Sequence, residues 1–258
     1  MASSTHKLYH VHTFDSRQFL EHYVAENNEI QDDSLIFPIE NLTRVFTEGH
    51  INGNVLIDLS ISSMVHHLYS ACEFFKHIIV LKVSDRCIME LKRWLDTRTG
   101  AFDWGHAIKL HAEIEEKSHQ LEEKEGKVRS AVQHVVRCHL EKENMMDPIV
   151  LPPADCIIVA WLLGAISKDQ EDYIRYFGKF SKLLKPGGHL VLFEDLDTTY
   201  YTVGKDRHHY FKHDEDFIRK VLAGEGFVID VCKVKERTAV SDLCDYKAVI
   251  FIVAHKGK

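Results

Sequence analysis

The sequence lacks a basic excess and a long hydrophobic run. Its 258 residues contain 32 Lys and Arg against 39 Asp and Glu, which gives a formal charge of −7 with both signs spread along the chain. A surface that follows phosphates needs clustered cations, so nucleic acid is not an expected partner. No window approaches the roughly 18 apolar residues of a membrane span, and the start of the chain does not resemble a secretion signal. These absences favour a cytoplasmic protein that does not bind membranes.

Paired cysteines are lacking as well. The six cysteines form no C-x-x-C pair and recur at no fixed interval: Cys72, Cys87, Cys138, Cys156, Cys232 and Cys244. That spacing argues against a zinc site and against a disulfide framework. Free thiols inside apolar runs, such as ADCIIVAWLL, behave as small hydrophobic side chains.

Histidine, in contrast, is abundant, with 18 residues. His208 and His209 lie near His213, and the i, i+4 spacing of His209 and His213 can bind a divalent metal on a helix. His66 and His67 form a second pair. Because no cysteine or acidic ligand motif accompanies them, surface or titrating histidines are favoured and no metal site is assigned.

Short apolar runs bounded by turn signals predict buried strands. They cover 55–59, 77–83, 155–161, 189–194, 227–231 and 248–254. Helical patterns lie between them, at 63–76, 84–96, 112–136, 168–184 and 213–224. This alternation predicts an α/β fold with a doubly wound, mostly parallel sheet. The last two strands are joined by a loop without helical periodicity, so we expect them to pair antiparallel.

Several segments together resemble the nicotinamide, indolethylamine and phenylethanolamine N-methyltransferases. They are FDSRQFLEHYV, VLIDLSISSMVHHLYSACEFFKHIIVLKVSD, LPPADCIIVAWLL and SKLLKPGGHLVLFEDLDTTYYTVG, and the resemblance runs nearly end to end. It implies a Rossmann-like class I methyltransferase fold that uses S-adenosylmethionine (SAM), with a seven-stranded sheet. The expected organisation is one domain over 1–258, with an N-terminal helical lid over 1–50 and a core over 51–258.

The segment that would hold SAM departs from the family pattern. The family has a glycine-rich loop after the first strand, approximately D-I-G-S-G-P, because glycine lets the backbone approach the cofactor closely. The corresponding residues here begin at Asp58, and both glycines are replaced, by Ser60 and Ser62. Ile61 stands where the family has a small residue. The resemblance therefore implies a degenerate cofactor loop.

Two acidic contacts of the family are also replaced. Lys82 stands where an acid accepts hydrogen bonds from the ribose, so an acceptor has become a donor. His139 stands where an acid lies near the adenine. Losing two or three such contacts, each worth about 1–3 kcal/mol, would weaken cofactor binding by several powers of ten. Asp85, three residues after Lys82, is the alternative ribose acceptor.

The substrate side is less changed. The resemblance places Tyr23 and Tyr201 in the aromatic walls of the substrate site, where they can stack on a planar ring or attract a cationic amine. Phe19 stands where the nicotinamide enzyme usually has a tyrosine. These positions imply a small aromatic or amine ligand.

Four polar residues are candidates for contact with that ligand. The resemblance makes Glu194 the acid that contacts the substrate amide and Thr198 the equivalent of a family serine. Asp214 and Glu215 are candidates to orient or deprotonate the amine. Asp195 adds negative charge nearby or belongs to a solvated loop.

Three functions remain open. The favoured one is a non-catalytic protein, a pseudoenzyme, that is monomeric and binds a small aromatic ligand or a partner without a cofactor. The second is an active SAM-dependent methyltransferase acting on nicotinamide-like or indolethylamine-like substrates. The third, a metal-responsive or pH-responsive protein, rests on the number of histidines alone.

Overall fold

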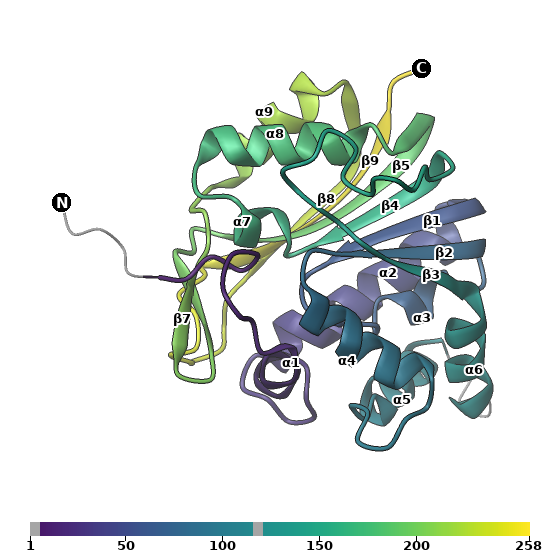
Figure 1. The fold of residues 1–258 in the computed structure, drawn as a ribbon, viewed down its shortest axis with the longest axis vertical. Coiled ribbons are helices and arrows are strands. Elements are labelled where there is room, and N and C mark those ends of the chain that lie inside the picture. Colours follow the sequence, from purple (N-terminus) through teal and green to yellow (C-terminus); the bar gives the residue numbers. More distant parts are fainter. Residues whose placement is uncertain (1–5, 116–120) are drawn as a thin grey trace.

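Among the described residues, 6–115 and 121–258 of the computed structural model, seven strands form a central sheet. The strands are β1 (Gly53–Ser60), β2 (Phe75–Lys82), β3 (Val132–Arg137), β4 (Ala154–Ala160), β5 (Leu184–Leu196), β8 (Phe227–Glu236) and β9 (Ala248–Lys256). Their order in space is β3-β2-β1-β4-β5-β9-β8 (Figure 1). The first five pair in parallel, and β9 pairs antiparallel with both β5 and β8. The predicted mostly parallel sheet with an antiparallel C-terminal hairpin is confirmed.

Helices connect the strands. They are α1 (Ser16–Tyr23), α2 (Phe37–Glu48), α3 (Leu68–Ala71), α4 (Asp85–Leu95), α5 (Gly105–Ile114), α6 (Leu121–Ala131), α7 (Leu163–Ile166), α8 (Gln170–Ser181) and α9 (Glu215–Gly224), with a π-helical turn, η1 (Asp32–Ile36), before α2. In Figure 1, α8 and α9 gather along one side of the sheet and α3 to α6 along the other. This is the arrangement of a doubly wound sheet, in which the strand order reverses between β1 and β4.

All six predicted strands are confirmed. The apolar runs of the inner strands are buried on both faces of the sheet, whereas the run at 227–231 lies in the edge strand β8 and is only partly buried. The seventh, β3, was missed. It lies inside the predicted helix 112–136, which is wrong as one element: α5 ends at Ile114, and α6 gives way to β3 at Val132. Residues 116–120 of that prediction lie outside the described residues. As an edge strand, β3 has half-buried and exposed side chains, so its sequence carries no continuous apolar run.

The predicted helix 63–76 is also wrong in its length. Only α3 is helical there, and β2 already begins at Phe75. The residues before α3 form a buried loop that packs against the end of β1. The other helices, α4, α8 and α9, match their predicted ranges to within a few residues.

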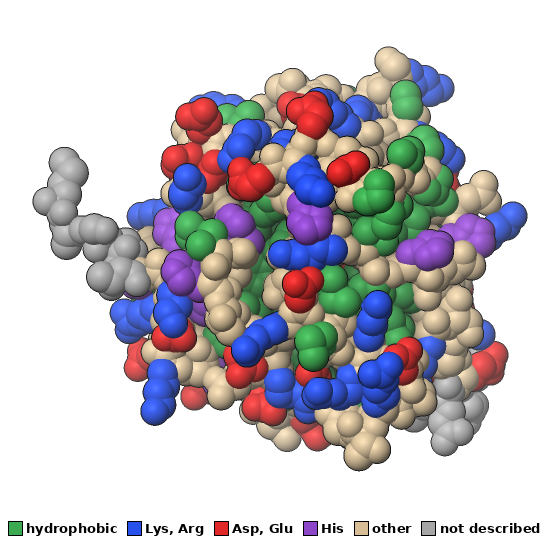
Figure 2. Space-filling view, viewed as in Figure 1, with side chains coloured by type: hydrophobic (Ala, Val, Ile, Leu, Met, Phe, Trp, Pro, Cys, Tyr) green, Lys and Arg blue, Asp and Glu red, His purple; other side chains and the backbone are tan. Residues whose placement is uncertain are grey.

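A small hairpin of β6 (Tyr200–Val203) and β7 (Asp206–His209) was not predicted. It lies beside α1 and the N-terminal segment, at the edge of the sheet where the parallel strands end (Figure 1). No helix in the described part of the chain is both long and apolar enough to cross a bilayer. On the face shown in Figure 2, acidic and basic side chains are interspersed.

Candidate functional site

The ends of β1 and β2 carry a buried polar network. Lys82 Nζ donates to the carbonyl oxygen and to Oγ of Ser60, each at 2.9 Å. Ser60 Oγ donates to Asp58 Oδ2 at 3.0 Å, and Asp58 Oδ1 lies 2.7 Å from His67 Nε2. All four side chains are buried. Three predicted cofactor positions, Asp58, Ser60 and Lys82, therefore satisfy one another within the chain.

The charges of this network influence one another. Burial lowers the pKa of Lys82, and the negative charge of Asp58 partly offsets that effect. Burial alone would raise the pKa of Asp58, but the charge and hydrogen bond of His67, together with Lys82, outweigh burial and lower it. Asp58 is therefore ionised at neutral pH, and its charge is held by groups of the same chain.

The loop after β1 keeps a glycine-like backbone at a serine. Ser62 has φ of +57°, in the left-handed region that glycine adopts at low cost. Its N–H donates to the hydroxyl of Tyr9 at 3.0 Å, and its Oγ lies 2.8 Å from Oγ of Ser16. Ser16 Oγ also contacts Ser63 Oγ at 2.7 Å. Tyr9 and Ser16, from the N-terminal part of the chain, thus form hydrogen bonds with Ser62 and Ser63 of the loop.

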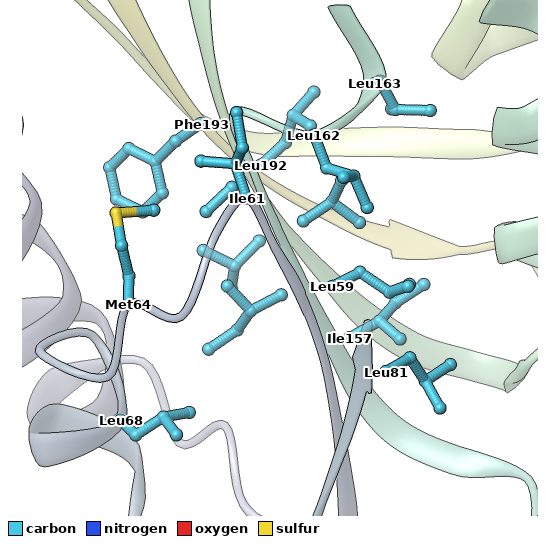
Figure 3. Close-up of a cluster of buried hydrophobic side chains, with 14 of the residues drawn as sticks. Leu59, Ile61, Met64, Leu68, Leu81, Ile157, Leu162, Leu163, Leu192 and Phe193 are labelled. Atoms are coloured by element: carbon cyan, nitrogen blue, oxygen red, sulfur yellow. The ribbon is translucent and has the colours of Figure 1, made fainter. Parts of the chain in front are cut away.

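Ile61 belongs to the hydrophobic core. Its side chain is 2% exposed. In Figure 3 it points into a cluster with Leu162 and Leu192, while Met64 lies beside Phe193. Ile61 and Met64 also line the cavity described below. The position that the family fills with a small residue is therefore occupied by an apolar side chain that packs on both the core and the cavity.

Two other predicted cofactor residues lie at the surface. Asp85 is the first residue of α4 and forms an ion pair with Arg137 at 3.3 Å. His139 is exposed and follows Cys138, whose N–H donates to the carbonyl oxygen of Lys82 at 2.8 Å. The backbone thus brings His139 to the neighbourhood of Lys82, but His139 takes no part in the buried network.

An aromatic cavity of about 50 Å³ lies next to the loop after β1. Its walls include Phe19, Tyr23, Trp161, Tyr201, Tyr210 and Tyr246. Three of the predicted substrate residues, Phe19, Tyr23 and Tyr201, are therefore brought together, and Thr198 also lines the cavity. A water needs about 10–15 Å³ on this measure, so the cavity has room for a few waters and a ring-sized ligand requires its walls to move apart.

Most polar groups at the cavity have partners within the protein. The hydroxyl of Tyr23 donates to the carbonyl oxygen of Thr202 at 2.7 Å, and Thr198 Oγ1 donates to Asp245 at 2.8 Å. In contrast, the buried hydroxyl of Tyr201 has no hydrogen-bond partner in the described part of the chain. Tyr201 is therefore a free donor or acceptor on the wall.

Two carboxyl groups also line the cavity. Asp195 accepts a hydrogen bond from Trp161 Nε1 at 2.8 Å, and Asp33 accepts one from the Tyr246 hydroxyl at 2.6 Å. Burial raises the pKa of Asp195 to about 7, against the lowering effect of Trp161. Asp33 also forms an ion pair with Lys235, so its negative charge is already compensated within the chain. The aromatic faces together with Asp195 suit a planar ring or an amine.

Glu194 lies behind the cavity wall, fully buried on β5. The hydroxyl of Tyr210 donates to Glu194 Oε2, and His213 Nε2 lies 3.7 Å from the same oxygen. Burial raises the pKa of Glu194 to about 8, although the hydrogen bond from Tyr210 lowers it. Glu194 is therefore largely protonated at neutral pH, and Tyr210 stands between it and the cavity.

Asp214 and Glu215 lie at the start of α9. Asp214 is the N-cap and accepts a hydrogen bond from the N–H of Phe217 at 2.9 Å. Glu215 forms an ion pair with Arg219 at 2.7 Å. Neither is among the residues that line the cavity. Within the described residues, no group of three His, Cys, Asp or Glu has an arrangement that could hold a metal ion.

Sequence reasoning missed several residues of this site. Tyr9 and Ser16 reach the loop after β1 from the N-terminal segment, and Tyr210 and Asp33 reach the cavity from elements far apart in the sequence. No local motif marks them. Trp161 directly follows the apolar run of β4, where parallel strands commonly carry functional residues, so its position could have been noted.

The chain is similar to known proteins over nearly its whole length. The model of the NNMT/PNMT/TEMT family matches residues 3–257. Nicotinamide N-methyltransferase of Homo sapiens is 30% identical over 245 residues, covering 94% of this chain and 93% of the relative. Indolethylamine N-methyltransferase of Mus musculus is 28% identical over 246 residues, covering 95% and 93%. Phenylethanolamine N-methyltransferase of Mus musculus is 29% identical over 252 residues, covering 94% and 85%.

Solved structures share the fold at low sequence identity. A SAM-dependent methyltransferase of Clostridium acetobutylicum has a TM-score of 0.57 at 12% identity, covering 89% of this chain and 95% of that one. The N-methyltransferase NodS of Bradyrhizobium japonicum, solved with S-adenosyl-L-homocysteine, has a TM-score of 0.53 at 13% identity, covering 95% and 100%. Because these identities are low, the structural matches establish the fold alone. The family match over nearly the whole chain goes further, and this protein belongs to the NNMT/PNMT/TEMT family of small-molecule N-methyltransferases.

Proposed function

We propose that this chain is a non-catalytic family member that binds a small aromatic or amine ligand in the aromatic cavity without SAM. In this proposal the protein is a cytoplasmic monomer that binds neither nucleic acid nor membranes. It is a single domain over 1–258, with a lid over 1–50 and a Rossmann-like core over 51–258. The interspersed charges in Figure 2 agree with a small-molecule partner.

The buried Lys82 is the main support for the loss of SAM. SAM carries a positive sulfonium and ribose hydroxyl donors. At the position of the family's ribose acceptor this chain presents a buried ammonium, already hydrogen-bonded to Ser60. To admit a cofactor, the network would have to open and leave buried charges without partners, which is costly. The residues present do not fit SAM.

The cavity supports ligand binding. It combines aromatic faces, the free hydroxyl of Tyr201 and the carboxyl group of Asp195. Such a lining suits a planar ring that carries an amine. Thr198, Phe19, Tyr23 and Tyr201 line the cavity and remain our candidate ligand residues. Glu194 is a candidate only if Tyr210 moves aside, and Asp214 and Glu215 are outer candidates that a change in α9 would have to bring closer.

The alternative is an active SAM-dependent methyltransferase that acts on nicotinamide-like or indolethylamine-like substrates. The aromatic residues around the cavity and the retained carboxyl group of Glu194 favour it, as do relatives that are named for this activity. Under this alternative, the network of Lys82 and Asp58 rearranges when the cofactor binds.

Calorimetric titration with SAM and, separately, with S-adenosylhomocysteine tests the two functions. We expect no binding of either at millimolar concentration. Micromolar binding would overturn the non-catalytic proposal and would call for a methyl-transfer assay on an amine panel. The matched control is the triple variant Ser60→Gly, Ser62→Gly and Lys82→Asp, which restores three positions of the family pattern and leaves Ile61 and His139 unchanged. If it also fails to bind, residues other than these three exclude the cofactor.

A second titration tests the ligand. Tryptamine and nicotinamide serve as probes, with Tyr201→Phe as the variant that removes only the free hydroxyl. We expect one probe to bind in the micromolar to millimolar range and Tyr201→Phe to weaken it by about three- to tenfold. If neither probe binds, these two classes of ligand are excluded.

A further inference from the structure

The N-terminal segment from Lys7 to Phe14, called the strap below, is attached to the β6–β7 hairpin. The N–H of Lys7 donates to the carbonyl oxygen of Arg207 at 3.0 Å, and the N–H of His209 donates to that of Lys7 at 2.7 Å. Lys7 Nζ also forms an ion pair with Asp206 at 2.7 Å. Figure 1 shows the strap running past β7 before it enters α1. The start of the strap at Lys7 is therefore held by backbone hydrogen bonds to β7, in the way that a neighbouring strand would be.

Tyr9 is the residue of the strap that contacts the degenerate cofactor loop. Its side chain is fully buried. Its hydroxyl accepts a hydrogen bond from the N–H of Ser62 at 3.0 Å and lies 3.1 Å from Cys87 Sγ. Ser62 belongs to the loop after β1, and Cys87 belongs to the first turn of α4, just after β2. Tyr9 thus joins the two elements between which the predicted cofactor contacts lie.

Phe14, at the other end of the strap, connects it to the cavity. Its ring packs edge-on against Tyr9 at 4.5 Å between centroids and lies 5.7 Å from Phe19. Phe19 in turn lines the cavity and lies 4.7 Å from Tyr23. A continuous series of aromatic contacts therefore runs from Tyr9 to the cavity wall.

We infer that the strap is a closing segment, in which Tyr9 is an internal occupant that covers the cofactor positions at Ser62 and Cys87. Replacing a small molecule by a side chain of the same chain removes the entropic cost of association, so the closed state needs no ligand. Release of Tyr9 frees the N–H of Ser62 and uncovers Cys87. The inference rests on the proposed function in one respect only, namely that the loop around Ser62 corresponds to the cofactor site of the family.

Cysteine labelling of the full chain tests this closure. We compare the parent protein with Tyr9→Phe and Tyr9→Ala, using N-ethylmaleimide and peptide mapping by mass spectrometry. Cys87 is fully buried in the closed state, and the equally buried Cys156 in β4 reports global unfolding. We expect Tyr9→Ala to speed labelling of Cys87 by at least about tenfold while Cys156 is unchanged.

Hydrogen exchange gives an independent measurement if Tyr9→Ala unfolds. Tyr9→Phe removes only the hydroxyl, and we expect about fivefold faster exchange at the amide of Ser62. The matched control is Tyr69→Phe, because Tyr69 is equally buried but its hydroxyl has no hydrogen-bond partner among the described residues. Unchanged protection of Ser62 in Tyr9→Phe, or unchanged labelling of Cys87 in a folded Tyr9→Ala, would overturn the inference. Neither measurement uses SAM or a cavity ligand, so its failure would not bear on the proposed function.

Discussion

The hydroxyl of Tyr210 donates a hydrogen bond to the buried carboxyl group of Glu194, and Gly164 makes that contact possible. A Cβ atom on Gly164 would overlap with Cε1 and Cζ of Tyr210. Because Gly164 in α7 has no side chain, the ring of Tyr210 can lie over Glu194. This packing separates the candidate catalytic acid from the cavity that it would serve.

The first prediction concerns Gly164. Gly164→Ala would push the ring of Tyr210 out of its place, and we expect the free energy of unfolding to fall by about 1–3 kcal/mol, measured by urea denaturation. Gly126→Ala in α6 is the control, because no described atom lies within 4 Å of a Cβ built there. That control should gain up to about 1 kcal/mol in helix propensity. Equal stability of the two variants would contradict the packing described.

The second prediction concerns pH. The pKa of Glu194 rises from its ordinary 4.5 to about 8 on folding, so the folded state keeps a proton that the unfolded state releases. The resulting stability is complete below about pH 4.5 and is lost as pH rises toward 8, with a slope of at most about 1.4 kcal/mol per pH unit. We therefore expect Glu194→Gln to gain stability relative to the parent protein between pH 5 and pH 8.

Thermal unfolding at several pH values measures this difference. The control is Glu143→Gln, because Glu143 is exposed. Its stability relative to the parent protein should not vary with pH. Asp195, whose pKa burial raises to about 7, adds a contribution of the same sign, and taking the difference between each variant and the parent largely removes it. A flat difference for Glu194→Gln would show that the carboxyl group is ionised when buried.

The third prediction concerns the backbone of Ser62. Both Ser62→Gly and Ser62→Ala remove the hydroxyl, but only glycine relieves a φ of +57°. We expect Ser62→Gly to be more stable than Ser62→Ala by about 1 kcal/mol in chemical denaturation. At the neighbouring Ser63, where φ is not positive, the order of the two variants should reverse because glycine costs more chain entropy.

The fourth prediction concerns Lys82. Lys82→Met keeps much of the shape but leaves Ser60 without its buried donor and Asp58 without a nearby positive charge. We therefore expect a loss of about 1–3 kcal/mol in the free energy of unfolding. Lys109→Met, on the exposed side of α5, is the control and should change stability by less than about 0.5 kcal/mol. If Lys82→Met were as stable as the parent protein, the buried ammonium of Lys82 would make no net contribution to the free energy of unfolding.

Much of the fold could be predicted because the central strands are buried on both faces and carry continuous apolar runs. The edge strand β3 and the hairpin β6–β7 have no such run. They are recognised as strands only in the structure, from the pairing of β3 with β2 and of β6 with β7. In the site, Phe19, Tyr23, Thr198 and Tyr201 could be assigned by resemblance to the family. Tyr9 and Tyr210 could not, because each acts through one contact between segments far apart in the sequence.

The left-handed turn at Ser62 has a consequence for how such proteins are recognised. A torsion angle that glycine adopts at low cost stands here at a serine, in a loop that Tyr9 and Ser16 hold by hydrogen bonds. A motif search for glycine letters would pass over this loop, whereas a search for the path of the backbone would find it.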